Sequence, residues 1–202
     1  MEKTKSYHDD VSLAAKVYPS GTKKFAIAKC YCGDVEIEVQ TEDPISTGFC
    51  HCVGCRTAHA APMYHVMYCG TGNIDCRTGK EKQGRHEIQI SKGFHNLSVV
   101  KRNPKGSKGN AILDRNPTER GLGRLQCSIC GTRMLNALIF PEDSSERYGV
   151  FPSTFTEKLN NFIQTWQPRR YFNCESAILP VSAIHDGLTK YVEMESEAKF
   201  VE

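Results

Sequence analysis

Seven of the ten cysteines fall into three short groups, and clustered thiols of this kind bind soft metal ions. The groups are Cys30-Tyr31-Cys32-Gly33, Cys50-His51-Cys52-Val53-Gly54-Cys55 and Cys127-Ser128-Ile129-Cys130-Gly131. Residues 1–10 lack the apolar core of a signal peptide, so we expect a cytoplasmic or nuclear protein. Because those compartments keep thiols reduced, the groups indicate metal binding and not disulfides.

The first and third groups predict a closed structural zinc site. In both, a glycine follows the second cysteine, where it allows a positive φ and lets backbone N–H groups turn toward the sulfurs. We therefore pair Cys30 and Cys32 with Cys127 and Cys130 as four tetrahedral ligands. Such a site would join two hairpins that are distant in sequence and would stabilise the fold.

The middle group predicts a second, open zinc site. Three ligands, Cys50, Cys52 and Cys55, leave one position free, as in reactive zinc centres. Three thiolates make the centre anionic, which suits a soft ligand such as a substrate thiol better than hydrolysis. Two alternatives stay open: the group binds no metal, or it is structural with a fourth ligand from His51, His59, His65 or Cys69.

The remaining pattern predicts a mainly β fold of short antiparallel sheets with one or two short helices. Phe25–Cys32 and Val35–Val39 alternate like a hairpin, and later apolar runs are separated by glycine and proline. The expected strands are 62–69, 86–91, 97–101, 124–128 and 134–140, and a helix is expected from Thr154 to Trp166. We divide the chain into an N-terminal arm (1–20), one zinc-binding domain (21–192) with a basic loop inserted at 101–124, and an acidic tail (193–202).

The basic loop is the strongest charge feature. Residues 101–124 contain seven lysines or arginines, but no aromatic residue lies there to stack on bases. We therefore interpret it as a solvated loop and expect no nucleic-acid partner. No apolar run approaches membrane-spanning length, so we expect no membrane partner either.

The three cysteine motifs together resemble the glutathione-dependent formaldehyde-activating enzyme family, which also includes centromere protein V. The matching pattern is C-x-C-G, then C-H-C-x-x-C-R ending at Arg56, then C-x-x-C-G-T ending at Thr132. The resemblance covers about Phe25 to Phe140. It implies a β-tent fold, a structural zinc on the outer groups and a catalytic zinc on Cys50, Cys52 and Cys55.

The resemblance also implies an activity, which is carbon–sulfur lyase chemistry on S-(hydroxymethyl)glutathione. We therefore expect two Zn²⁺ per chain and a substrate that joins glutathione, or a similar thiol, to an aldehyde. Arg56 would bind a substrate carboxylate. The alternatives are a glutathione carrier without chemistry and a non-catalytic zinc module that binds a thiol, a protein or nucleic acid.

Overall fold

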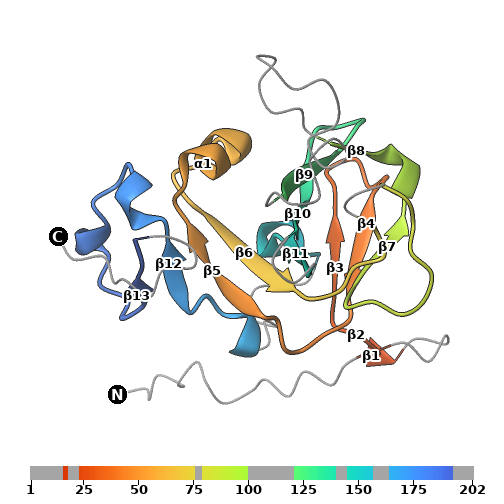
Figure 1. Cartoon of the computed structure of the whole chain (residues 1–202), viewed down its shortest axis with the longest axis horizontal. Helices are drawn as coiled ribbons and strands as arrows, with labels where there is room; N and C mark the ends of the chain where they lie inside the picture. Colours follow the sequence, from red (N-terminus) through yellow and green to blue (C-terminus); the bar gives the residue numbers. More distant parts are fainter. Residues whose placement is uncertain are drawn as a thin grey trace, which may run out of the picture.

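The computed structural model describes residues 16–17, 23–75, 79–99, 121–139, 145–156 and 164–192, and this part of the chain is mainly β (Figure 1). The predicted fold class is therefore confirmed. Most of the predicted arm, residues 101–120 of the basic loop and the acidic tail lie outside the described residues.

An eight-stranded sheet makes up most of the fold, in the order β13-β12-β5-β6-β11-β10-β9-β8. The bounds of these strands are β5 Ser46–Cys50, β6 Tyr64–Cys69, β8 Leu97–Val99, β9 Gly121–Cys127, β10 Arg133–Ile139, β11 Glu146–Val150, β12 Arg170–Phe172 and β13 Thr189–Lys190. Neighbours pair antiparallel from β5 to β8, whereas β12 pairs parallel with both β5 and β13. The last strands of the chain are therefore added beside β5.

A second sheet contains β3 (Ala26–Lys29), β4 (Glu36–Val39) and β7 (Ile88–Lys92). The predicted first hairpin is confirmed, because β3 and β4 pair antiparallel from Ala26↔Val39 to Lys29↔Glu36. A further two-stranded pair is formed by β1 (Lys16–Val17) and β2 (Lys23–Lys24).

The main core lies between the small sheet and one face of the large sheet. Apolar residues alternate along the strands as expected for half-buried sheets. The small sheet contributes Ile37, Val39 and Ile88, and the large sheet contributes Leu135 and Val150, all nearly inaccessible to solvent. The opposite face of the large sheet carries a second apolar cluster around the middle cysteine group.

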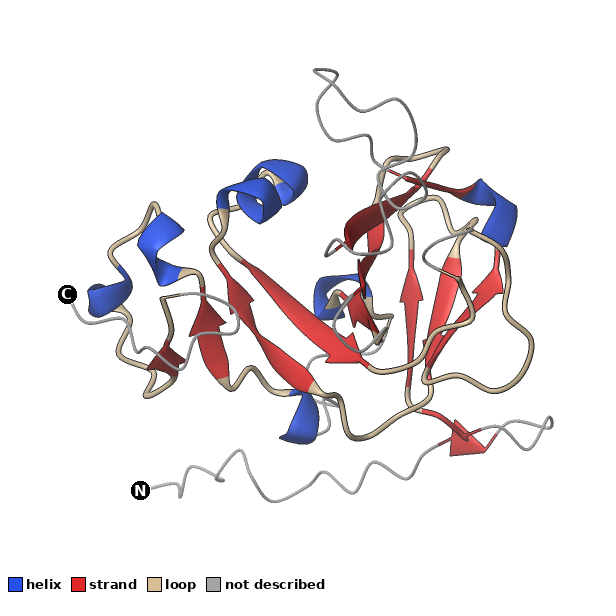
Figure 2. Ribbon diagram, in the orientation of Figure 1, coloured by secondary structure: helices blue, strands red, loops and turns tan. Residues whose placement is uncertain are grey.

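Helical structure is short in the part of the chain that the structure describes (Figure 2). The α-helix α1 (Val53–His59) follows β5 and was not predicted, since its seven residues carry no amphipathic repeat. Single 3₁₀ turns occupy η1 Phe94–Asn96, η2 Pro152–Thr154, η4 Gln164–Trp166, η5 Cys174–Ser176 and η6 Val181–Ala183. The ends of the helix predicted from Thr154 to Trp166 are 3₁₀ turns, and its middle, 157–163, lies outside the described residues.

Candidate metal centres

Two hairpin turns of similar build carry the outer cysteine groups. Cys30 and Cys32 lie in the turn between β3 and β4, and Cys127 and Cys130 lie at the turn between β9 and β10. Each turn is closed by a glycine of positive φ, Gly33 at 79° and Gly131 at 75°. This is the conformation that the two C-G pairs predicted.

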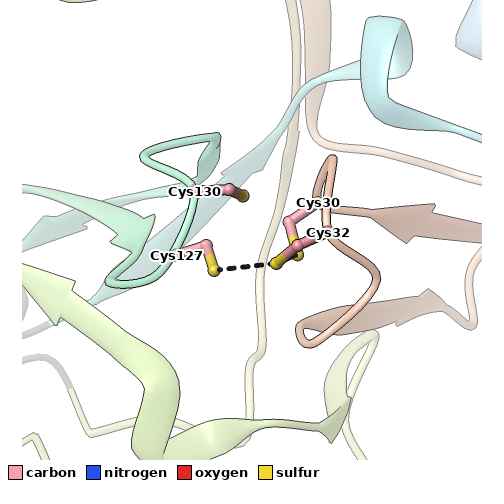
Figure 3. A group of neighbouring side chains, drawn as sticks. All are labelled: Cys30, Cys32, Cys127 and Cys130. Atoms are coloured by element: carbon pink, nitrogen blue, oxygen red, sulfur yellow. Dashed lines mark hydrogen bonds between the residues drawn. The ribbon is translucent and has the colours of Figure 1, made fainter.

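The two turns face each other with their sulfurs between them (Figure 3). Cys30 Sγ and Cys32 Sγ are 3.4 Å apart, and Cys32 Sγ and Cys127 Sγ are 3.7 Å apart. All four sulfurs lie within 4.8 Å of one another. A tetrahedral ion with sulfur ligands at about 2.3 Å separates them by about 3.8 Å, so this group has the right size for a metal.

Backbone hydrogen bonds connect the two turns and shape the first of them. Tyr31 N donates to Thr132 Oγ1 across the gap at 3.1 Å, and Val35 N donates to Cys30 Sγ at 3.2 Å. The Thr132 hydroxyl lies 3.2 Å from Cys130 Sγ, and this hydrogen bond is the main cause that lowers the pKa of Cys130 to about 5. A lowered pKa favours the thiolate, which is the form of cysteine that binds a metal.

The middle group is built where β5 runs into α1. Cys50 is the last residue of β5, Cys52 precedes the helix, and Cys55 lies in its first turn. The carbonyl of Cys52 accepts hydrogen bonds from the N–H groups of Cys55 and Arg56, both at 3.0 Å. These bonds fold the motif so that the three sulfurs lie within 4.8 Å of one another.

The side chains considered as a fourth ligand point elsewhere. His59 stacks on Tyr64 with ring centres 4.2 Å apart, and His65 Nε2 lies 2.7 Å from a threonine hydroxyl. Cys69 belongs to the main core, and His51 is buried beside the ring of Tyr171. Within the described part of the chain, no fourth cysteine, histidine or carboxylate joins the three sulfurs.

Two of the three sulfurs receive hydrogen bonds from other side chains. Tyr64 Oη and Arg124 Nη2 donate to Cys55 Sγ at 3.2 and 3.5 Å. Asn173 Nδ2 donates to Cys50 Sγ at 3.5 Å. Such donors stabilise a thiolate and orient it.

The pKa values follow this asymmetry. Hydrogen bonds from Cys50 and Cys52, followed by those from Tyr64 and Arg124, lower the pKa of Cys55 to about 2 against the opposing effect of burial. The hydrogen bonds that Cys50 makes with Cys52 and Cys55, together with its burial, raise the pKa of Cys50. Of the three cysteines, Cys55, the sulfur with two donors, is therefore the one whose thiolate form is most favoured.

The first cysteine turn and the middle group fall inside a segment that has recognisable relatives. Residues 26–97 match the model of the glutathione-dependent formaldehyde-activating enzyme family. The resemblance predicted from the cysteine motifs is confirmed over this segment. No curated protein matches the chain. Among the described residues, no helix has the length and apolar character needed to cross a membrane.

Sequence reasoning missed the donors around the middle group, and three of the four residues involved lie outside the family match. Arg124 was assigned both to the end of the basic loop and to the start of the strand predicted at 124–128. Because β9 begins at Gly121, residues 121–124 are strand. Tyr64 (β6), Asn136 (β10) and Asn173 (after β12) carried no motif or spacing signal. Only the pairing order of the sheet brings them beside the cysteines.

A hydrogen bond to a nearby backbone carbonyl holds the side chain of Arg56 in place. Its Nε donates to the carbonyl of His51 at 2.9 Å. The side chain is partly exposed, and this hydrogen bond leaves the terminal guanidinium nitrogens available for another partner. The position is compatible with the expected role in binding a substrate carboxylate.

Asn173→Gly should weaken metal binding at the middle group about tenfold, because outer ligand partners contribute at this level. Asn173 adopts the left-handed conformation at φ 57°, which glycine also accepts, so the backbone should not change. Competition with a chelator would measure the affinity. Asn173→Asp should weaken binding further, since it places a negative charge beside Cys50. Equal affinity of all three proteins would contradict a role for Asn173.

Proposed function

We propose that the protein is a zinc-dependent carbon–sulfur lyase-type enzyme acting on an adduct of an aldehyde with glutathione or a similar thiol, such as S-(hydroxymethyl)glutathione. The observation that carries the proposal is the group of three sulfurs that no fourth ligand of the described residues completes. The family match of residues 26–97, to glutathione-dependent formaldehyde-activating enzymes, supports the same chemistry.

Zinc is the metal that these donor sets suit best. Cys30, Cys32, Cys127 and Cys130 make an all-sulfur set of four, and the middle group makes an all-sulfur set of three. Thiolates select soft ions, and zinc occupies both closed four-ligand and open three-ligand sites. We assign a structural zinc to the first set and a catalytic zinc to Cys50, Cys52 and Cys55.

The reaction needs a held thiol and a proton transfer. In the forming direction the thiol sulfur bonds to the aldehyde carbon, and the thiol proton moves to the aldehyde oxygen. In the reverse direction the carbon–sulfur bond breaks and the proton returns to sulfur. Zinc bound in the middle group supplies a Lewis acid that stabilises a thiolate or an oxygen.

The protein's own residues bind and orient the substrate. Cys50, Cys52 and Cys55 hold the ion, and the donors on Cys50 and Cys55 keep two of these sulfurs in place. Arg56, one helical turn from Cys52, pairs with a carboxylate of the thiol peptide. Only Cys52 is partly exposed among the three cysteines, so the substrate approaches from its side.

Calorimetric titration of the zinc-loaded protein should show glutathione binding in the millimolar range or tighter. S-methylglutathione should bind at least about tenfold more weakly, because it has no thiolate to give the metal. Arg56→Gln should weaken both ligands alike, since it removes only the carboxylate contact. If neither glutathione nor S-methylglutathione binds, the proposal is contradicted. If both bind equally well, the contact between the metal and the substrate thiolate is contradicted.

A rate measurement separates the enzyme from a glutathione carrier. NMR exchange spectroscopy on glutathione and formaldehyde should show faster interconversion with the adduct when the protein is added at catalytic amounts. A carrier would bind glutathione and leave this rate at its uncatalysed value.

A further inference from the structure

Arg124 is a buried cation on the large sheet. It lies on β9 with 8% of its surface exposed, directly opposite Asn136 of β10. Its neighbour Leu125 points into the main core, so Arg124 points to the other face, where α1 and the middle cysteines lie. Its Nη2 reaches Cys55 Sγ at 3.5 Å.

Two neutral side chains extend the contacts of Cys55 on this face. Asn136 Nδ2 donates to Tyr64 Oη at 3.0 Å, and Tyr64 Oη donates to Cys55 Sγ at 3.2 Å. The polar side chains of β6 and β9 thus reach one sulfur directly, and that of β10 reaches it through Tyr64. Tyr64 and Asn136 are almost fully buried. Burying polar side chains in an apolar cluster costs free energy unless they are hydrogen-bonded, and here the hydrogen bonds lead to Cys55.

The charge of Arg124 requires a counter-ion. Burying a guanidinium without one costs several kcal/mol. Within the described residues no carboxylate forms an ion pair with Arg124. The anionic partner that the structure offers is the thiolate group, through Cys55.

The formal charges balance only for a divalent ion. Three thiolates and a divalent cation sum to one negative charge, and the guanidinium brings the total to zero. A monovalent ion such as Cu(I) in the same sulfurs would leave the buried group negative. Charge neutrality in a desolvated site therefore favours a divalent metal bound by all three thiolates.

We propose that Arg124 is the counter-ion of the middle metal site and that, together with Tyr64 and Asn136, it positions Cys55 as the most firmly held ligand. This inference rests on the proposed zinc at Cys50, Cys52 and Cys55. Arg124 touches no substrate in this role and is a positioning residue. Its effect is on how tightly the site retains a divalent ion and on the geometry of the Cys55 ligand.

The test compares metal retention in variants of the full chain. Wild-type protein loaded with Co²⁺ should bind two ions, and chelator competition gives the affinity of the weaker site. Arg124→Met should lower that affinity by about 10- to 100-fold, the range for outer partners of metal ligands, and should shift the sulfur-to-cobalt absorption of this site. Arg124→Lys should recover part of the loss, because it restores the charge without the guanidinium shape.

Arg133→Met is the matched control. Arg133 is a partly buried arginine on the adjacent strand that donates to the carbonyl of Ala58 and to Gln126, but to no sulfur. Its replacement should leave metal affinity and the cobalt spectrum unchanged. If Arg124→Met does not fold, Tyr64→Phe tests the same network by removing one hydroxyl. Tyr64→Phe should lower the metal affinity about tenfold.

The outcomes separate this inference from the proposed function. If wild-type protein binds only one ion, the open metal site fails and this inference with it. If wild-type protein binds two ions and the folded Arg124→Met and Tyr64→Phe variants bind them equally well, only the role of Arg124 is overturned. A loss in Arg133→Met as large as in Arg124→Met would also overturn it.

Discussion

Cys127→Ser is expected to remove most of the folded stability of the protein. Cys127 is completely buried, lies at the end of β9 and places its sulfur 3.7 Å from that of Cys32 in the other turn. This variant loses a ligand of the proposed metal site, which would join two hairpins distant in sequence, and structural zinc binding is coupled to folding. We expect a loss of more than about 4 kcal/mol, which is exceptional for one substitution. Circular dichroism melting in the presence of zinc would measure it.

The chain offers a matched control for that experiment. Cys69 is equally buried in the same core but belongs to neither cysteine group. Cys69→Ser therefore introduces the same hydroxyl without removing a ligand, and it should cost only about 1–3 kcal/mol. If both variants melt at the same temperature, burial of the hydroxyl explains the loss and the structural metal site is contradicted.

Cys52→Ser is expected to abolish activity and leave the fold intact. Cys52 is the partly exposed member of the middle group, so its replacement costs little packing. Removing one of three ligands should lower metal affinity and turnover by more than about 100-fold, the upper range for outer partners of a ligand. The exchange rate between the adduct and its components measures turnover. Zinc content after mild chelation should fall to about one ion per chain in both this variant and the wild type.

The comparison between the two variants decides the roles of the two cysteine groups. Melting of Cys52→Ser should resemble that of the wild type, whereas Cys127→Ser should not. Equal loss of stability in both variants would mean that the middle group is structural. Full turnover in Cys52→Ser would contradict its role as a catalytic ligand.

The predictions that agree with the structure were made from the spacing of residues close together in the sequence. The hairpin of β3 and β4 could be predicted because alternation of apolar residues is a property of neighbouring positions. The positive φ of Gly33 and Gly131 follows from the same local logic, and so does the bend that gathers the middle cysteines. By contrast α1 was missed, since seven residues that include Gly54 show no helical repeat, and its packing against β6 is a tertiary contact.

By itself, the sequence indicated which cysteines gather in turns that could chelate a metal, and it indicated a mainly β fold and a family. It also indicated that the turns at Cys30 and Cys127 pair, although 95 residues separate Cys32 from Cys127. Only the tertiary structure decided what surrounds the middle group. Arg124, Tyr64 and Asn173 reach its sulfurs because β12, β5, β6, β10 and β9 lie in one sheet. Such convergence depends on long-range strand pairing, which no spacing along the chain encodes.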